Sequence, residues 1–426
     1  MIKFLIRGVL KDKNRSLFPV LIVSIGVFLT VFLSCWLGGV MGDAIDLMAK
    51  FTTGHVKVMS KSYAENENQM PNDLALADVS ELMKKLKADY PDMQWAERIR
   101  FGGLLDVPDE NDETKNQGPA VGLAIDMLSD KSAEIERLNI SGAIQRGKIP
   151  SKRNEALISE SFAEKLKINP GDKITLFGTT MNGSMTFHNF IVSGTVKFGS
   201  QGLDKGSIII DLLDAKHVLD MEDAASEIMG YMPSGVYDDE KASQVAASFN
   251  ANYIDSDDEY APVMKRLQEQ GGMAEYVAMA SNMVGILIGV FIFALAIVLW
   301  NTGLLNGLRR YNEFGIRLAM GENKGHIYRS LLIESALIGI IGSVIGTGLG
   351  LALSYYLQKN GLDFSEFTKD ATSSMMMPNV FRAVVSPQAF YIGFFPGVLS
   401  IVMGNMLSGI GIYKRKTAQL FKELEV

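Results

Sequence analysis

Cysteine is almost absent from this chain of 426 residues, because Cys35 is the only one. A single thiol excludes an intrachain disulfide and any zinc or iron–sulfur site built from several cysteines. Basic charge is also scarce: 41 Lys and Arg stand against 48 Asp and Glu, a formal net charge of −7. A nucleic-acid-binding domain needs a basic face, so the composition argues against a nucleic-acid partner.

Motifs for nucleotide binding and catalysis are missing as well. The sequence contains neither the P-loop pattern G-x-x-x-x-G-K-[ST] nor the hydrolase pattern G-x-S-x-G. Its four histidines lack the spacing of a metal-binding pair. The acidic run of Asp255, Asp257, Asp258 and Glu259 is compatible with a calcium site or with a solvated loop, and we favour the loop. We therefore predict a non-catalytic chain that binds no metal or cofactor; any nucleotide would be hydrolysed by another chain.

Charged residues are only 21% of the chain, and hydrophobic residues are 47%. Four long windows contain no Asp, Glu, Lys or Arg: residues 16–42, 276–308, 335–358 and 383–413. Each exceeds the ~20 residues that span a bilayer. The apolar residues before Glu334 extend the third to 330–358. The first is too long for the apolar core of a cleavable signal peptide. We predict four transmembrane helices, the first a retained anchor.

Basic residues indicate the orientation. Segments 1–15, 309–329 and 414–426 are rich in Lys and Arg, which places them in the cytoplasm. The long loop 43–275 and the short loop 359–382 then lie outside. Residues 43–275 carry 39 acidic and 24 basic residues, a net charge of −15, whereas the rest of the chain carries +8. The basic start is either an amphipathic helix at the membrane surface or an extension of the first span.

The long loop has the pattern of an α+β domain. We expect strands at 54–59, 95–107, 120–126, 187–198, 206–212, 227–232 and 252–256, and helices at 78–88, 214–219 and 239–249. Residues 155–178 indicate a strand, a short helix, a turn and a second strand, and 108–118 a solvated loop. The fold class is therefore an α-helical membrane protein with four transmembrane helices and an α+β extracytoplasmic domain, which we expect to form two subdomains.

The cytoplasmic segment 309–329 is too apolar for a simple linker in water, because it contains Phe314, Ile316 and Leu318. Gly315 and Gly321 are expected to interrupt a helix there. A short helix between turns suits docking into a groove of a cytoplasmic partner. A plain hairpin between two membrane helices fits the same residues equally well.

Glycines line one face of the third span at Gly339, Gly342, Gly346 and Gly350. The spacing G-x-x-x-G permits close helix packing, either within the chain or at a dimer seam. Glu334 precedes this stripe. We favour a place for it at the membrane edge over a role in proton relay.

Residues 309–346, RRYNEFGIRLAMGENKGHIYRSLLIESALIGIIGSVIG, resemble the FtsX-like permease domain of ABC transporters, which include the macrolide exporter and the lipoprotein-releasing permeases. The residues that fall on the pattern are Glu313, Gly315, Ile316, Arg317, Ala319, Gly321, Glu334, Gly342 and Gly346. EALISESFAEKLKINPGDKITL is similar to the MacB-type periplasmic core domain, and GHVKVM to the lipoprotein-release branch. The resemblance covers essentially the whole chain. The tail departs from the family because it lacks the usual prolines.

The resemblance implies a bacterial inner-membrane permease subunit with its large domain in the periplasm. Two copies of a separate ABC ATPase, which binds ATP and Mg, would dock on the coupling segment Glu313, Phe314, Gly315, Ile316, Arg317, Leu318 and Gly321. A second permease, identical or different, would complete a dimer in the lipid bilayer. The substrate would be a lipoprotein or amphipathic molecule, passed to a periplasmic acceptor protein.

Adaptable side chains near the membrane surface are candidate substrate contacts: Met41, Ile45, Met48, Met279 and Met283. One alternative is a mechanotransmitter that regulates an extracytoplasmic protein without moving cargo. Another is a membrane-anchored enzyme that uses carboxylates of the external domain.

Overall fold

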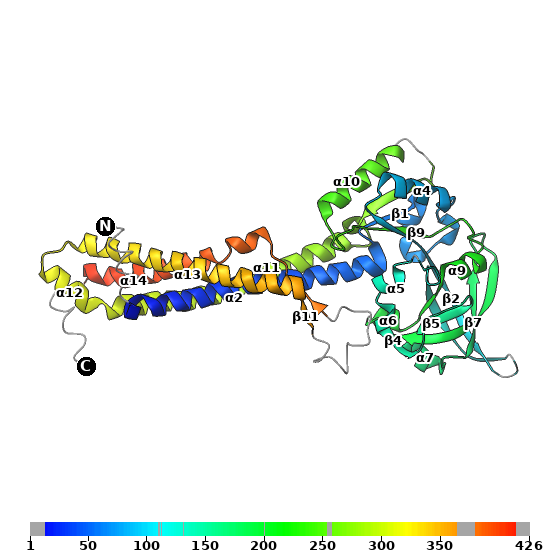
Figure 1. Cartoon of the computed structure of the whole chain (residues 1–426), viewed down its shortest axis with the longest axis horizontal. Coiled ribbons are helices and arrows are strands. Elements are labelled where there is room, and N and C mark those ends of the chain that lie inside the picture. The colour runs from blue at the N-terminus through cyan, green and yellow to red at the C-terminus, as the bar shows by residue number, and fades with distance from the viewer. Residues whose placement is uncertain are drawn as a thin grey trace. The chain divides into compact units, whose positions relative to one another are not determined.

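The computed structural model describes residues 13–109, 111, 113–130, 132–199, 201–253, 258–363 and 380–414 (Figure 1). The chain forms two compact units. One comprises the residues up to Gly42, Met279–Leu362 and the residues from Phe381 onwards. The other comprises Asp43–Ala278 and Asp363–Val380. Some of the predictions concern residues outside this described part, namely 1–12, 254–257, 364–379 and 415–426.

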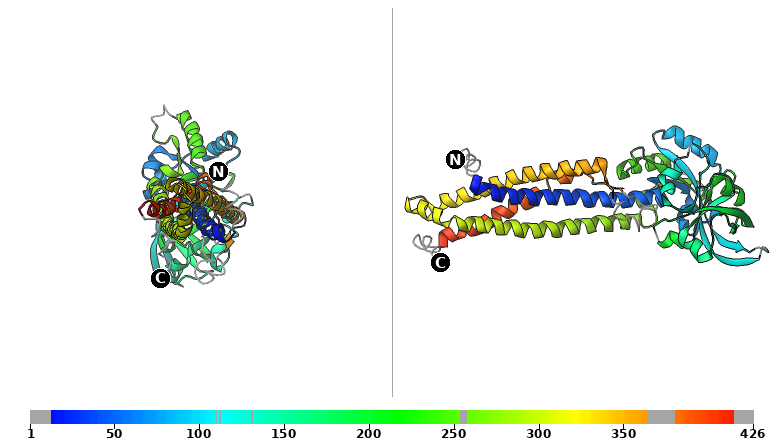
Figure 2. Two further views of the ribbon diagram at one scale, coloured as in Figure 1. Left: turned by 90° about the vertical axis from the view of Figure 1, so that its left-hand side faces the viewer. Right: turned by 60° about the horizontal axis from the view of Figure 1, so that its bottom comes forward.

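The helical unit is built from long apolar helices that run alongside one another (Figure 2). They are α2 (Lys13–Met48), α11 (Met273–Arg309), α12 (Tyr311–Ala319), α13 (Lys324–Asn360) and α14 (Ser400–Lys414), with the turns η6 (Pro387–Phe390) and η7 (Phe395–Leu399) before α14. Four stretches are long and apolar enough to cross a membrane: Leu17–Thr53, Met273–Arg309, Lys324–Asn360 and Pro387–Ile410. The helices run past the uncharged windows because charged residues at an edge do not end a helix.

The glycine stripe of α13 packs within the chain. A Cβ atom placed on Gly342, Gly346 or Gly350 would lie 2.7–2.9 Å from carbon atoms of Val23, Val27 or Val31 of α2 respectively. Real Cβ atoms do not approach that closely, so only glycine allows this helix contact. Gly339 faces the η7–α14 side, where its Cβ would lie 2.9 Å from Cα of Val398. The glycines thus serve close packing within the chain, which is the first of the two interpretations given above, rather than a dimer seam.

The sheet unit alternates strands and short helices. Its strands are β1 (Val56–Ser60), β2 (Gln94–Pro108), β3 (Thr114–Ile125), β4 (Ile144–Gly147), β5 (Glu155–Ser159), β6 (Lys173–Thr179), β7 (Met185–Val196), β8 (Ser207–Asp211), β9 (Glu227–Tyr231) and β10 (Pro262–Arg266). Its helices are α3 (Lys61–Glu65), α4 (Val79–Asp89), α5 (Glu134–Arg137), α6 (Ile140–Ala143), α7 (Glu160–Leu166), α8 (Gln201–Asp204), α9 (Leu212–Val218) and α10 (Asp239–Asn250). A two-residue pair, β11 (Leu362–Asp363) and β12 (Val380–Phe381), stands apart from this sheet.

Six strands close into a barrel, in the order β2, β3, β8, β5, β7, β6 and back to β2. Alternate residues of each strand point inward, as in other small barrels. Phe101, Ile174, Phe190 and Ile208 fill the interior with Phe162 of α7. Closure leaves these strands without free edges.

A second group of strands continues the same sheet, in the order β10, β1, β9, β2, and carries its own core. Val58, Ile228 and Met264 pack there with Leu86 of α4 and Phe249 of α10. The long strand β2 joins the two parts, because residues 94–98 pair with β9 and 99–108 pair with β3. The expected two subdomains are thus two cores on one continuous sheet.

Most expected strands are present, but two expectations were wrong and two strands were missed. Tyr253 belongs to a 3-10 turn (Ala251–Tyr253) rather than to a strand. Residues 114–118, expected as loop, begin β3, because their backbone pairs with β2 despite their polar side chains. Strands β4 and β10 were not expected, because each is short and polar and is held by a distant partner.

Candidate functional site

The short helix α12 lies between α11 and α13, where the sequence indicated a helix flanked by turns. Glu313 in its first turn and Arg317 in its last turn both favour the helix dipole. The helix ends before Gly321, whose φ of +89° is a conformation that suits glycine. Gly315 does not interrupt the helix as expected. An interior glycine costs only about 1 kcal/mol relative to alanine, and packing on either side of it offsets that cost.

One face of α12 is buried in the chain's own core. Phe314 is 1% exposed and packs with Tyr311, Ile327 and Leu331, with Leu318 beside them. The Tyr311 hydroxyl donates to the backbone oxygen of Ser408 in α14, at 2.8 Å. Phe314 and Leu318 therefore hold α12 in place and do not present a surface.

The opposite face is apolar and open to solvent. Ile316 is 52% exposed, and Met320, just after the helix, is 74% exposed. Glu313, Arg317 and Gly321 lie beside them, half-buried or exposed. Two exposed apolar side chains within one turn, flanked by charges, form a small apolar surface on α12 of a kind that could dock a partner, and we call it the docking surface.

Ion pairs fix the turn between α12 and α13. Arg317 donates to both carboxylate oxygens of Glu322, at 2.5 and 2.6 Å, and His326 Nδ1 lies 2.5 Å from Glu322 Oε1. The hydrogen bond from Arg317 and then that from His326 lower the pKa of the Glu322 carboxyl to about 2. Arg317 is thus committed to an internal pair, and it orients α12 against the start of α13.

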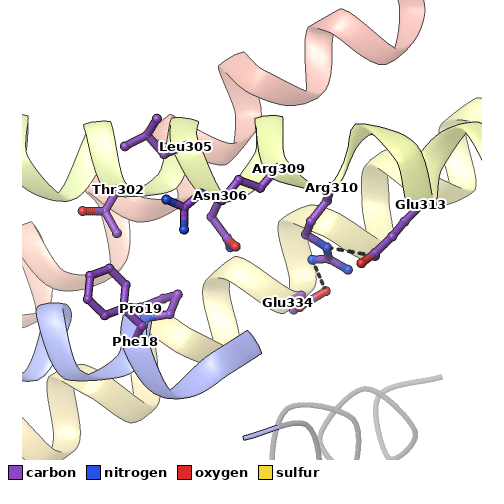
Figure 3. A pocket seen from close by; sticks show the side chains of 9 residues that line it. All are labelled: Phe18, Pro19, Thr302, Leu305, Asn306, Arg309, Arg310, Glu313 and Glu334. Carbon is purple, nitrogen blue, oxygen red and sulfur yellow. Dashed lines mark hydrogen bonds and ion pairs between the residues drawn. The ribbon is translucent and has the colours of Figure 1, made fainter. Parts of the chain in front are cut away.

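A second cluster of charges lies where α11 meets α12 and α13. Arg310 donates to Glu313 at 3.3 Å and to Glu334 at 2.8 Å (Figure 3). Glu334 thereby has a cationic partner within the chain. An acid in such a pair anchors one helix to another; its placement at a membrane edge stays a prediction.

The candidate substrate residues divide between the two units. Met41, Met279 and Met283 belong to the helical unit, and Ile45 and Met48 to the sheet unit. Met279 and Met283 are 63% and 57% exposed on α11. Ile45 packs against Ala49, Leu267 and Met273. Within each unit these side chains lie on helix surfaces.

A pair of glycines on α11 was missed from the sequence. Gly285 and Gly289 have the G-x-x-x-G spacing, yet no described atom lies within 4 Å of a Cβ placed on either one. Their neighbours Ile286, Val290 and Phe293 are at least 64% exposed. The spacing itself was the signal, and the sequence shows it in residues 276–308 as clearly as in residues 335–358.

The segment that follows α2 belongs to the sheet unit and is held by side chains of that same unit. The last carbonyls of a helix have no partner within it, and here α2 passes into a π-helical turn, Ala49–Thr53. Three of its carbonyls receive donors from separate segments: Lys50 from Tyr231 at 3.1 Å, Phe51 from Arg98 at 3.1 Å and Thr53 from Gln270 at 3.0 Å. Arg98 is fully buried and also donates to Glu134 at 2.7 Å. We call these donors the carbonyl clamp.

Among the described residues, no three His, Cys, Asp or Glu side chains gather as metal ligands. His55 is buried, and its Nδ1 accepts the backbone N–H of Met232 at 2.9 Å. His188 is hydrogen-bonded to Asn154 at 2.8 Å.

Two family models match the chain. The MacB-like periplasmic core domain matches residues 16–248, and the FtsX-like permease C-terminal domain matches residues 285–417. The two matches place the sheet unit and the region of α11 to α14 in known families.

Curated relatives match parts of the chain. The macrolide export ATP-binding/permease protein MacB of Neisseria gonorrhoeae is 35% identical over 94 residues, 22% of this chain and 14% of that protein. The ABC transporter permease YknZ of Bacillus subtilis is 28% identical over 26% of this chain and 28% of its own. The lipoprotein-releasing system transmembrane protein LolC of Xylella fastidiosa is 23% identical over 48% of each chain. The aligned part is thus about half of LolC and much less of the others.

A solved structure, the periplasmic region of MacB from Actinobacillus actinomycetemcomitans, aligns with a TM-score of 0.34 and 12% identity. The alignment covers 52% of this chain and 92% of that one.

Proposed function

Since the chain belongs to the MacB-like periplasmic core domain family and carries an FtsX-like permease domain, we propose that it couples ATP hydrolysis by a separate ATPase to work on a substrate outside the membrane. It is a permease subunit of an ABC transporter of the MacB and LolC type. The proposed substrate is a lipoprotein or another amphipathic molecule, extracted or exported at the outer side of a bacterial inner membrane and passed to a periplasmic acceptor protein.

The observation that carries the proposal is the docking surface on α12. Ile316 and Met320 are exposed while Phe314 is buried beneath them, so a partner could press on the helix without unfolding it. The Arg317–Glu322 pair ties α12 to α13. A push on the docking surface would therefore move α13 as well. Two ATPase subunits, which bind ATP and Mg themselves, are the proposed partners there.

We place the four apolar stretches across the bilayer, with 1–15, 309–329 and 414–426 in the cytoplasm and 43–275 and 359–382 outside. The proposed spans are 16–42, 276–308, 330–358 and 383–413. The charge split between the long loop and the rest of the chain supports this orientation. We further propose that two permeases pair through the open face of α11 at Gly285 and Gly289, because close contacts at glycines stabilise helix pairs in lipid.

The carbonyl clamp favours a second candidate function, force transmission to an extracytoplasmic protein without cargo. Three hydrogen bonds, backed by the buried Arg98–Glu134 pair, fix residues 50–53 within the sheet unit. Both functions need the helix to move the sheet unit. They differ in whether Met41, Ile45, Met48, Met279 and Met283 touch a substrate. Alanine at these positions should block cargo release by a transporter and leave a pure transmitter active.

The first test is purification of the tagged chain from native membranes in mild detergent, with mass spectrometry and an ATPase assay. We expect an ABC ATPase to co-purify with the wild type. Ile316→Glu and Met320→Glu should lose it, because each puts a charge into an apolar contact. Met185→Glu is the matched control, since Met185 is 87% exposed in the sheet unit. Full retention of the ATPase by Ile316→Glu would show that α12 is not the docking site.

A further inference from the structure

A cavity of about 320 Å³ lies within the sheet unit. Its walls come from the end of α2 and the π-helical turn after it, the residue before β1, the start of β2, helix α5, and the end of β9 with the loop that follows. The lining residues are Asp46, Lys50, His55, Gln94, Ala133, Glu136, Arg137, Tyr231, Met232, Pro233 and Gly235. Its volume is at the lower end of the range for small-molecule sites.

The charges around the cavity balance. Lys50 Nζ lies 2.7 Å from Asp46 Oδ2, and Arg137 is bonded to Glu134 just outside the lining. Glu136 is exposed at the rim. Two acidic and two basic residues therefore line the cavity. A site without excess charge offers no electrostatic complement to an ion, which favours an uncharged ligand.

Two buried polar atoms of the lining lack a partner. His55 is 1% exposed, and its Nδ1 accepts the backbone N–H of Met232, so the ring hydrogen lies on Nε2. His55 Nε2 is 3.9 Å from Asp46 Oδ1, which is too far for a hydrogen bond. Within the described part of the chain, neither atom has a hydrogen-bond partner. Buried polar groups are normally paired, so an occupant that bonds to both atoms is favoured.

The two atoms select a hydroxyl group. Nε2 offers a hydrogen, and Oδ1 accepts one. A hydroxyl both accepts and donates, so one oxygen placed between them satisfies the pair. The oxygen of an ionised carboxylate or phosphate has no hydrogen for Oδ1, and an ammonium has no lone pair for the Nε2 hydrogen.

The rest of the lining extends this pattern. Gln94 carries an amide and Glu136 a carboxylate, which can pair with further hydroxyls. Met232 and Pro233 add apolar side chains to the wall. Alternating hydroxyls beside an apolar face of C–H groups are the chemistry of a sugar ring.

We propose that this cavity binds a neutral polyhydroxylated ligand, of the class of a hexose ring. One hydroxyl bridges His55 and Asp46, and a neighbouring hydroxyl meets Gln94. The C–H face of the ring lies on Pro233. Free saccharides and the sugar headgroups of glycolipids share this chemistry. The site depends neither on the ATPase nor on the substrate proposed above.

The test is saturation-transfer NMR of the full chain in lipid nanodiscs, which avoids detergents with sugar headgroups. Glucose is the probe, and glucose 6-phosphate and glucosamine are its charged analogues. Glucose should bind several-fold more tightly than either analogue. A glucosyl diacylglycerol built into the discs should displace glucose if a headgroup is the natural occupant, and should leave it bound if a free saccharide is.

Variants separate the hydroxyl bridge from the ion pair. Asp46→Leu should weaken glucose binding about tenfold, since a hydrogen bond to a charged group contributes that much. Asp46→Asn keeps an oxygen acceptor and should retain most of the binding. Lys50→Met breaks the same ion pair but leaves Asp46 Oδ1 in place, so it should bind as the wild type does. Glu164→Leu removes an exposed acid of α7 outside the cavity and should change nothing.

Four results would overturn the proposal. They are no binding of glucose, which would mean that water alone fills the gap; tighter binding of glucose 6-phosphate than of glucose; wild-type binding by Asp46→Leu; and a loss in Lys50→Met as large as in Asp46→Leu. The comparison of the three sugars needs no variant, so it decides the matter even if Asp46→Leu does not fold.

Discussion

Helices α11 and α13 are both 37 residues long and strongly apolar, yet they differ in what covers them. In the most apolar window of α13, 39% of the residues are buried, against 6% in α11. Both carry glycines at G-x-x-x-G spacing. Valine side chains of α2 pack directly against Gly342, Gly346 and Gly350 of α13. On α11, no atom of the described residues lies within 4 Å of a Cβ placed on Gly285 or Gly289. The motif marks a place for close contact, and the fold decides whether the contact is internal.

The largest effect is expected from Gly346→Leu. The Cβ of residue 346 would lie 2.5 Å from the backbone oxygen of Ser24, so α2 and α13 must separate. Overpacking of this kind costs about 3 kcal/mol, measured as a lower thermal midpoint in detergent. The matched control is Gly348→Leu, two residues along the same helix, where no described atom lies within 4 Å. Equal midpoints for the two variants would mean that α2 does not fill the stripe.

A smaller effect, of another kind, is expected from Gly289→Leu. Folding should be unchanged because no described atom is near, but pairing between copies should weaken about tenfold. Light scattering and cross-linking in detergent, over a range of protein concentrations, measure this. Gly348→Leu again serves as control. If Gly289→Leu pairs as the wild type does, the open face of α11 meets lipid instead.

The smallest effect is expected from pH at the start of α13. The pKa of Glu322 is about 2 in the folded chain and 4.5 in the unfolded one. The lowered value means that its stabilisation is complete above pH 4.5 and is lost as pH falls toward 2. The protection of the amides in the turn 320–323, measured as the exchange rate relative to the intrinsic rate at the same pH, should fall over that window. Glu322→Gln should abolish this pH dependence. Amides beside the glycine contacts of α13 should show no pH dependence of protection over the same window.

Local patterns predicted much of the fold. Residues 155–178 form the expected strand, helix, turn and strand, because apolar spacing and the turn at Gly171 act over short range. The closure of the barrel was not predictable, because it depends on pairing between strands such as β3 and β8 that lie far apart in sequence. The buried side of α12 was missed for a related reason. Phe314 and Ile316 are equally apolar, and only the position of α13 distinguishes them.

The pairing of β1 with β10 has a consequence for the order in which the chain is made. Val58 lies opposite Met264, so the first strand of the sheet unit finds its edge partner only after about 200 further residues have been synthesised. During that interval β1 has an unpaired edge and an apolar face. The nascent domain is then attached to a long apolar helix at one end only, because β10 precedes α11 in the chain. A truncation before residue 262 would therefore leave a strand open to aggregation.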